Sequence, residues 1–400
     1  MLFKTCLFFC ALFPLFAIES PSCILIDAKT GHVLFEKNAY TTKYPASLTK
    51  VATALFTIKQ RQDKLNLKAK VSQNAIGWVK AEAIVNSNYT LPSYHLTHGS
   101  THAGLKANER YKLIDLLYAM MLISANDAAN VLAEYVGGTI PQFVEDLNAY
   151  LKDIGCKDTH FKNPHGMHHP DHKSTAWDLA NMGVHAIQDP LLCQIVGTIK
   201  YPFSEKTTLY QYNKLLKRGK YYLPEAIGIK TGYHKRAGHC LLAAAKKGDR
   251  LLVACVLGAK KGQEYKDAIE LFKLGFAAKK VQKEIIACGP QTPKLHLPKA
   301  GKAIETETKE AFSVEHFPKQ TPQFRCLLCW NTLKLPVKKG DKVGALVLKD
   351  SSDNLVKRID LFAKNHVDFH WIFKVKRICF HLLYLAPLSL LLFLMFRKRR

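Results

Sequence analysis

The 400-residue sequence lacks the short motifs that mark several large classes of protein. It contains no G-x-x-x-x-G-K-[ST] loop for nucleotide phosphates, no zinc-finger spacing of Cys and His, and no RNP-like motif for RNA. The absence of G-x-S-x-G argues against a serine hydrolase with a histidine base. Cys326 and Cys329 have no second C-x-x-C elsewhere in the chain, so a local disulfide or two free thiols is favoured over a zinc site or a redox pair.

Acidic residues are also scarce relative to basic ones. The chain has 32 Asp and Glu against 58 Lys and Arg, which gives a formal net charge of +26. Such a charge suits nucleic acid, an anionic membrane surface or an anionic cell envelope. The lysines are spread along the whole chain, and the segments described next predict export. We therefore expect no nucleic-acid partner and a basic surface beside anionic lipid or polymer.

The two ends of the chain carry apolar segments. Lys4 precedes an apolar run from residue 6 to residue 18, which is typical of a secretory signal peptide. We assign this peptide to residues 1–20, with cleavage between Ala17 and Cys23. Residues 378–396 contain no charged side chain and precede the basic tail 397–400. As a helix they would be about 28 Å long, so we expect a transmembrane anchor with a cytoplasmic tail.

The intervening residues predict two domains. Helix-like and strand-like patterns alternate over residues 21–280, which indicates an α/β (α+β) domain with an antiparallel sheet, flanking helices and a helical subdomain. The predicted strands cover 23–28, 32–36, 226–233, 239–245 and 250–257, and the predicted helices cover 113–123, 127–137, 143–154, 176–186 and 265–276, with one more after Ser47. Residues 61–108 read as an elaborated loop region. Prolines interrupt short apolar runs over 281–373, which predicts a small all-β domain.

The sequence Ser47-Leu-Thr-Lys50 opens an amphipathic helix and pairs a possible nucleophile with a possible base. Residues three apart on a helix are neighbours, so the Lys50 amine can reach the Ser47 hydroxyl. A serine alcohol needs such a base, and lysine serves as one only when burial or a nearby cation keeps it neutral. An isolated S-x-x-K is more often a capping serine followed by a solvated lysine.

Two further short motifs follow in the same domain. Ser124-Ala-Asn126 lies between two hydrophobic helices, where its polar side chains need partners. Lys230-Thr231-Gly232 lies on a predicted strand, and Gly232 indicates that something approaches the backbone closely there. Taken singly, each tripeptide is an ordinary cap or turn.

The three motifs occur once each, in the order known for penicillin-binding proteins and class A β-lactamases. From about Cys23 to the predicted anchor, the chain resembles the low-molecular-weight penicillin-binding proteins, serine D-alanyl-D-alanine carboxypeptidases. Residues 104–106, 172–176 and 339–344 add to the resemblance. It implies a DD-peptidase/β-lactamase-like fold, a bacterial inner-membrane location with the catalytic domain outside the cytoplasm, and a peptidoglycan stem peptide and β-lactam antibiotics as partners. It implies neither a cofactor nor a metal.

The resemblance also implies roles for single residues. Ser47 is acylated by the penultimate D-Ala carbonyl, Lys50 takes its proton, and Ser124 relays a proton to the leaving amine. The substrate contacts implied are Asn126 to the peptide amide, Lys230 and Thr231 to the terminal carboxylate, Gly232 on the strand beside the substrate, Arg250 to the same carboxylate, and the backbone N–H groups of Ser47 and Tyr233 to the oxyanion. The family often carries histidine where this chain has Tyr233.

Several alternatives stay open at this stage. A β-lactamase is disfavoured because the E-x-x-L-N pattern is absent, the nearest sequence being Glu145-Asp-Leu-Asn148. A DD-endopeptidase and a non-catalytic envelope-binding protein would carry the same motifs. Four histidines between His165 and His172 could ligate zinc, but proline and glycine mark this stretch as a loop with little preorganisation.

Overall fold

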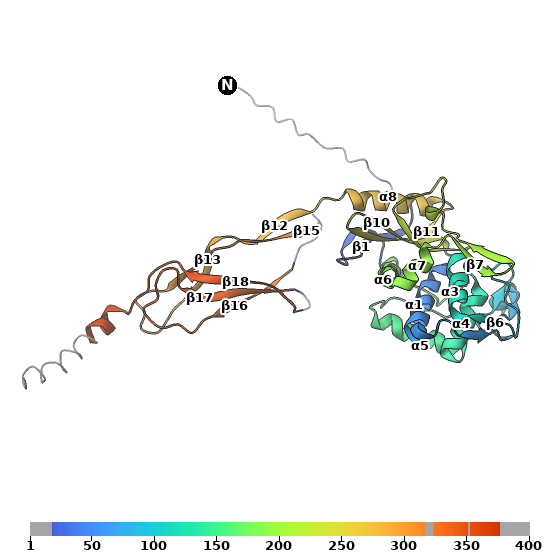
Figure 1. Cartoon of the computed structure of the whole chain (residues 1–400), viewed down its shortest axis with the longest axis horizontal. Coiled ribbons are helices and arrows are strands. Elements are labelled where there is room, and N and C mark those ends of the chain that lie inside the picture. The colour runs from blue at the N-terminus through green and yellow to red at the C-terminus, as the bar shows by residue number, and fades with distance from the viewer. Residues whose placement is uncertain (1–17, 317–322, 351–352, 377–400) are drawn as a thin grey trace, which may run out of the picture. The chain divides into compact units, whose positions relative to one another are not determined.

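The structure is a computed structural model that describes residues 18–316, 323–350 and 353–376. It divides into two compact units, and the boundary in the sequence lies between Ala278 and Lys279 (Figure 1). The first unit holds all three motifs. Each unit is described by itself below.

A five-stranded antiparallel sheet forms the framework of the first unit. Its strands are β1 (Ser22–Asp27), β2 (Val33–Lys37), β9 (Ala226–His234), β10 (Gly238–Lys247) and β11 (Arg250–Ala259), in the spatial order β2-β1-β11-β10-β9. All five were predicted, and the sheet joins the first strands of the unit to its last ones. The strand that carries Lys230, Thr231 and Gly232 is therefore an edge strand, open to a ligand on its outer side.

Helices cover both faces of this sheet (Figure 1). The helices of the unit are α1 (Thr49–Arg61), α3 (Leu113–Leu122), α4 (Asn126–Gly137), α5 (Ile140–Asp153), α6 (Ala176–Gln188), α7 (Pro190–Gly197) and α8 (Gln263–Ala277). Helix α8 packs against the sheet on one face and α6 on the other, and α1 packs against α6 and against α3, α4 and α5. This two-sided cover explains why residues 240–245 and 252–257 are buried without interruption, where a half-exposed strand would alternate. Helix α7 was not predicted.

Side-chain caps fix the starts of several helices. The Thr139 hydroxyl accepts from Gln142 N–H at 3.2 Å, with Pro141 in the first turn of α5. The Thr175 hydroxyl accepts from Asp178 N–H at 3.1 Å and starts α6. Helix α1 begins differently, because a 3₁₀ turn at Ala46–Leu48 leads straight into it. Ser47 thus lies in this turn, two residues before α1 begins at Thr49.

The segment between α1 and α3 is an elaborated region of short elements, as the sequence predicted. It contains a 3₁₀ turn (Gln62–Lys64), β3 (Lys68–Lys70), β4 (Trp78–Val79), α2 (Ala81–Asn86), β5 (Leu96–Thr97) and β6 (Arg110–Lys112). A hairpin of β7 (Lys200–Ser204) and β8 (Thr207–Tyr210) and a 3₁₀ turn (Lys214–Leu216) lie between α7 and β9. This hairpin was not predicted.

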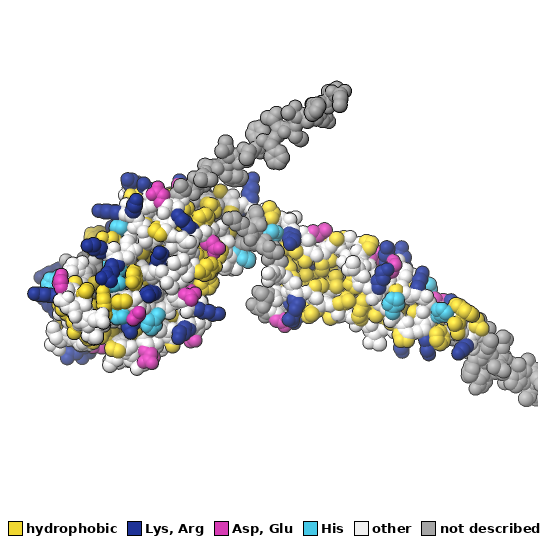
Figure 2. Space-filling model, turned by 180° about the vertical axis from the view of Figure 1, so that it is seen from behind, with side chains coloured by type: hydrophobic (Ala, Val, Ile, Leu, Met, Phe, Trp, Pro, Cys, Tyr) yellow, Lys and Arg dark blue, Asp and Glu magenta, His cyan; other side chains and the backbone are white. Residues whose placement is uncertain are grey.

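The described part of the second unit is largely β-structure. Its strands are β12 (Val281–Ile286), β13 (Gly289–Leu295), β14 (Ile304–Thr308), β15 (Phe312–His316), β16 (Arg325–Trp330), β17 (Lys342–Lys349) and β18 (Leu355–Ala363). Strands β12 and β15 pair with each other, and the other five form a sheet in the order β13-β14-β18-β17-β16. A small core that includes Ile304, Val343 and Leu361 holds this sheet. Figure 2 shows hydrophobic side chains gathered on the visible face of this unit, and basic side chains spread over both units.

Within residues 18–316, 323–350 and 353–376, no helix is long and apolar enough to cross a membrane. The predicted anchor at 378–396 and nearly all of the predicted signal peptide lie outside the described residues. Glu19 and Ser20, which we assigned to the signal peptide, contact the body of the first unit. Their backbone N–H groups donate to the Asp267 carboxylate of α8, the Ser20 N–H at 2.8 Å.

Candidate active site

The turn that carries Ser47 is held against β9. A Cβ atom added to Gly232 would lie 3.0 Å from Ser47 N and 3.1 Å from Pro45 O. The close approach predicted from Gly232 is thus made by the Ser47 turn itself, and only glycine allows it without a shift. Ala46 has a φ of +49°, a strained value for a residue with a side chain. This backbone conformation is imposed by its surroundings and sets the position of Ser47.

Lys50 lies beneath Ser47 and is fully buried. Its Nζ atom is 3.1 Å from Ser47 Oγ, 2.6 Å from Asn126 Oδ1 and 2.6 Å from the backbone oxygen of His165. Burial, and next the positive charge of Lys230, hold the pKa of Lys50 well below its usual range, while Asp127 acts in the opposite direction. The structure therefore brings the first two motifs together around one amine.

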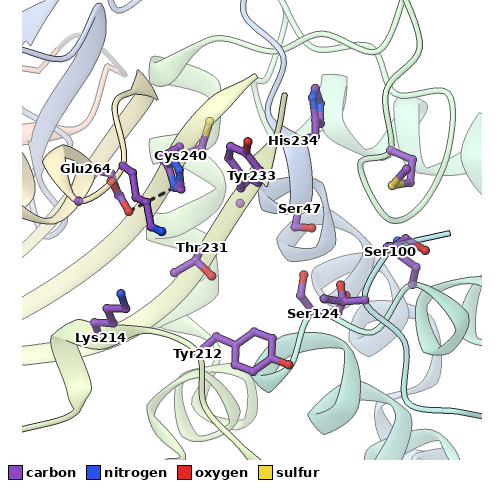
Figure 3. Close-up of a pocket in the computed structure, with 18 of the residues that line it drawn as sticks. Ser47, Ser100, Ser124, Tyr212, Lys214, Thr231, Tyr233, His234, Cys240 and Glu264 are labelled. Carbon is purple, nitrogen blue, oxygen red and sulfur yellow. Dashed lines mark hydrogen bonds and ion pairs between the residues drawn. The ribbon is translucent and has the colours of Figure 1, made fainter. Parts of the chain in front are cut away.

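Ser124 lies across the cleft from Thr231 of β9 (Figure 3), and Asn126 opens α4 and lines the same cavity. Ser124 has a φ of +66°, which again marks a strained residue at this site. Its Oγ is buried and has no hydrogen-bond partner within the described residues. Because a buried hydroxyl is normally paired, this oxygen is available to a ligand in the cleft.

The K-T-G motif forms the opposite wall. Lys230 is 2% exposed, its Nζ donates to the backbone oxygen of Thr231 at 2.9 Å, and burial lowers its pKa to about 7. Thr231 and Tyr233 line the same cavity of about 690 Å³ as Ser47, Ser124 and Asn126. Tyr233 is 59% exposed and stacks on His239, with ring centroids 4.4 Å apart.

Arg250 does not belong to this site, and the prediction that it contacts the substrate carboxylate is wrong. Its guanidinium donates to the backbone oxygens of Gly275, at 2.5 Å, of Phe276, at 3.1 Å, and of Ala278 at the end of α8. The antiparallel register gives the reason. Arg250 pairs with Lys247, beyond the Ala226 end of β9, while Tyr233 pairs with His239 at the other end of the sheet. Arg250 opens β11 as predicted, but it lies at the end of the sheet away from the active site.

Two other basic residues, Lys214 and Lys261, line the cavity, which Arg250 does not. Lys261 follows the end of β11, and Lys214 lies in the 3₁₀ turn (Lys214–Leu216) between β8 and β9. Both line the cavity together with Thr231, and Figure 3 shows Lys214 and Thr231. Lys214 lies over the stacked rings of Tyr221 and Tyr265. Neither lysine has a motif around it, so the sequence offered no signal for them beyond their charge.

The sequence also missed the residues that fasten the elaborated segment to the site. Asn126 N–H donates to Thr101 O at 2.9 Å, and the Thr101 hydroxyl donates to Ser124 O at 2.7 Å. The buried Asp127 carboxylate accepts from the backbone N–H groups of Ala103 and Leu105. These bonds hold residues 97–105 beside the S-x-N turn, where His98 to Thr101 line the cavity. The acidic residue directly after S-A-N was the available signal.

The histidine-rich loop has a positioning role in the structure. Besides the His165 oxygen on Lys50, His172 Nε2 lies 2.8 Å from Thr49 Oγ1, and its Nδ1 accepts from Lys162 N–H at 3.0 Å. His165 and His172 are buried, and burial lowers the pKa of both. In the described part of the chain, no group of three or more His, Cys, Asp or Glu side chains is placed to hold a metal ion.

This geometry agrees with comparisons to known proteins. A model of the D-alanyl-D-alanine carboxypeptidase family matches residues 11–261. The chain is 30% identical over 347 residues to the D-alanyl-D-alanine carboxypeptidase DacF of Bacillus subtilis, which covers 85% of this chain and 84% of DacF. The chain belongs to the D-alanyl-D-alanine carboxypeptidase family. The family and the serine-type enzyme class expected from the three motifs are confirmed.

Other members of the family match mainly through the first unit. DacD of Salmonella typhimurium is 33% identical over 256 residues, which is 62% of this chain and 60% of DacD. The chain therefore spans less than two thirds of that relative.

Solved structures in this family confirm the DD-peptidase fold. Penicillin-binding protein 6B from Escherichia coli superposes with a TM-score of 0.59 at 26% identity, covering 85% of this chain and 94% of that one. Penicillin-binding protein 5 from Haemophilus influenzae gives a TM-score of 0.58 at 25% identity, covering 87% of this chain and 97% of that one.

Proposed function

We propose that this protein is a serine D-alanyl-D-alanine carboxypeptidase that removes the terminal D-Ala of peptidoglycan stem pentapeptides and is acylated by penicillin. Family membership supports the reaction class, and the arrangement of Ser47, Lys50 and Ser124 supports the assignment of the catalytic residues. Ser47 is the nucleophile, Lys50 is its base, and Ser124 passes a proton to the leaving amine.

The hydrogen bonding of Lys50 carries the proposal. A neutral amine has two N–H donors and one lone pair, whereas an ammonium has three donors and none. Two acceptors, Asn126 Oδ1 and the His165 oxygen, lie 2.6 Å from Nζ and take both N–H groups. Nζ and Ser47 Oγ are 3.1 Å apart, so in the neutral amine the remaining lone pair can accept the Ser47 proton. The depressed pKa of Lys50 agrees with this neutral state.

The reaction follows from this arrangement. Lys50 takes the Ser47 proton as Oγ attacks the penultimate D-Ala carbonyl, and the N–H groups of Ser47 and Tyr233 stabilise the oxyanion. Ser124 Oγ, unpartnered in the described residues, donates its proton to the leaving nitrogen and receives in its place the proton that Lys50 took from Ser47, so that both residues return to their neutral forms. Water then hydrolyses the acyl-enzyme and frees Ser47. Asn126 both holds Lys50 and lies where the peptide amide would bind.

The terminal carboxylate of the substrate is assigned to Thr231, Lys230, Lys214 and Lys261. Thr231, Lys214 and Lys261 all line the cavity, and in the view of Figure 3 Lys214 lies beyond Thr231 from Ser47. A free carboxylate there gains charge-assisted hydrogen bonds that an internal peptide bond does not make. This favours cleavage at the end of a peptide over cleavage within one.

We also propose that the protein is exported and held in the bacterial inner membrane by residues 378–396, with its catalytic domain outside the cytoplasm. The apolar segments at both ends of the sequence support this arrangement. Ending the chain at Phe373 should release a soluble protein that still binds penicillin. Retention of that shortened protein as an integral membrane protein would contradict the proposed anchor.

Release of D-alanine tests the activity directly. Purified protein is incubated with a pentapeptide ending in D-Ala-D-Ala, and free D-alanine is measured beside the Ser47→Ala variant. Release by the wild type alone supports the proposal. An intact pentapeptide, together with penicillin labelling of Ser47, would instead indicate a non-catalytic binding protein.

A further inference from the structure

Strand β16 (Arg325–Trp330) of the second unit is an edge strand within the described residues, and Arg325 at its start is its single charged residue. It is the last strand of its sheet, and within the described residues it pairs with β17 alone. Residues 326–330 carry no charge, and Leu327 and Leu328, on opposite faces, are 37% and 42% exposed. Sheet edges are usually protected by charges, proline or bulges, because their free N–H and C=O groups pair readily with another strand.

The same strand carries two exposed thiols. The eight described cysteines are all unpaired, and three of them, Cys288, Cys326 and Cys329, are exposed. Cys288 Sγ donates to Thr308 O at 3.6 Å, and the other two exposed thiols both lie on β16. Residues three apart on a strand point to opposite faces and are about 10 Å apart, so Cys326 and Cys329 cannot bond to each other here. This excludes the local disulfide that the sequence allowed.

We propose that β16 pairs antiparallel with β16 of a second copy of this chain, and that a disulfide joins the two Cys329 residues. Two-fold symmetric antiparallel pairing sets one residue opposite its own copy, so a single cysteine supplies both halves of the bond. No other thiol-bearing partner has to be invoked. The inference concerns the second unit and does not depend on the proposed catalytic function.

The backbone hydrogen bonds select Cys329 over Cys326. Asn331 N–H donates to Val343 O at 2.9 Å, and because hydrogen-bonded pairs alternate along a ladder, Cys329 also turns its backbone groups toward β17. The backbone groups of Leu328 and Trp330 then face the open edge. In a dimer centred on Cys329, Leu328 and Trp330 of opposite chains form hydrogen-bonded pairs.

Centring on Cys329 also suits the disulfide itself. The two Cys329 residues form the closer, non-hydrogen-bonded type of pair, with Cα atoms about 4.5 Å apart, within the range for a disulfide. Burial raises the pKa of the Cys326 thiol, which lowers its thiolate fraction. Leu328 opposite Trp330 adds an apolar cross-strand contact on each side of the symmetry axis.

The bond forms by thiol–disulfide exchange with a disulfide oxidant, glutathione disulfide in the test below. One Cys329 thiolate attacks the oxidant, forms a mixed disulfide and releases one glutathione thiolate. The Cys329 thiolate of the second copy attacks the Cys329 sulfur and releases the other. Two cysteine thiols lose two electrons, the oxidant gains them, and the two protons end on glutathione or in solvent.

The test uses the full chain in detergent, oxidised with glutathione disulfide and separated on non-reducing gels. Wild type, Cys288→Ser and Cys326→Ser should give a band of twice the monomer mass that reductant removes, and Cys329→Ser should give none. Leu328→Lys should slow cross-linking by at least about tenfold, because it puts a charge beside Trp330 on both sides of the axis. Thermal melting of each variant checks that the fold is intact.

Three outcomes would overturn the proposal. They are an absence of the cross-link in the wild type, a cross-link that persists in Cys329→Ser, and a cross-link lost in Cys326→Ser but kept in Cys329→Ser. A full cross-linking rate in folded Leu328→Lys would show that the thiols meet without the strand pairing, and would also reject it.

Discussion

The backbone oxygen of His165 lies 2.6 Å from Lys50 Nζ, so a loop far along the sequence holds the Lys50 amine. This loop and the Asn126 side chain together fix the amine that faces Ser47. The amine is thus positioned by two groups outside its own motif.

Ser47→Ala should abolish covalent labelling by penicillin, because the β-lactam carbonyl requires the Ser47 oxygen. Lys50→Ala should slow acylation by about 10²–10⁴, the usual effect of losing a general base. Labelled penicillin followed on denaturing gels measures both. Unchanged labelling of Ser47→Ala would remove Ser47 from its role.

Gly166→Ala should slow acylation and lower the melting temperature. Gly166 has a φ of +88°, and an added Cβ would lie 1.9 Å from Ala46 O, so the loop must move away from the Ser47 turn. Gly31→Ala is the matched control, since Gly31 has a φ of +72° but no atom within 4 Å of an added Cβ. Both changes strain the backbone, and only the first should displace the His165 oxygen. Equal acylation rates in the two variants would contradict this positioning role.

Lys230 should make stability depend on pH. Its folded pKa is about 7, below the ordinary value of 10.5, so the unfolded chain binds more protons between these values. The free energy of unfolding should therefore rise with pH over that window, by up to about 1.4 kcal/mol per pH unit from this group. Lys230→Met should flatten the rise in urea titrations between pH 7 and 10. An unchanged slope would mean that Lys230 is charged in the folded protein at pH 9.

Lys261→Ala and Lys214→Ala should each lower kcat/KM for peptides with a free C-terminal carboxylate by about 10- to 100-fold, the effect of losing a hydrogen bond to a charged group. Peptides with an amidated C-terminus should be poor substrates and little changed. Lys246→Ala, an exposed lysine at the other end of the sheet, is the control. Similar losses on both peptides would show that these lysines do not recognise the carboxylate.

The sequence predicted the parts of the site that are local. Ser47 and Lys50 are one turn apart, Ser124 and Asn126 share a turn, and a strand fixes Lys230 and Thr231 in sequence, so short motifs describe them well. The contacts that join these parts depend on the fold. Gly166 touches Ala46, and Asp127 holds Ala103, through packing that no spacing in the sequence reveals.

Arg250 shows the same limit for strands. Its place on β11 was predicted, but which end of β9 it lies beside depends on the register and on the strand lengths. Arg250 lies nearly the length of a strand away from the predicted position beside the active site. The hairpin β7–β8 and helix α7 were missed because their segments are short and weakly patterned.

The sheet order has a consequence for synthesis. Strand β1 lies between β2 and β11, so residues 22–27 complete their pairing only with residues 252–257, and the Ser47 turn is held by Gly232. A chain that has not yet been extended to β11 cannot close this sheet, and its β1 edge remains unpaired until β11 follows. Binding of a fluorescent penicillin would accordingly report the moment at which the whole first unit has folded. A chain interrupted before Gly232 would present Ser47 and Lys50 without acquiring reactivity.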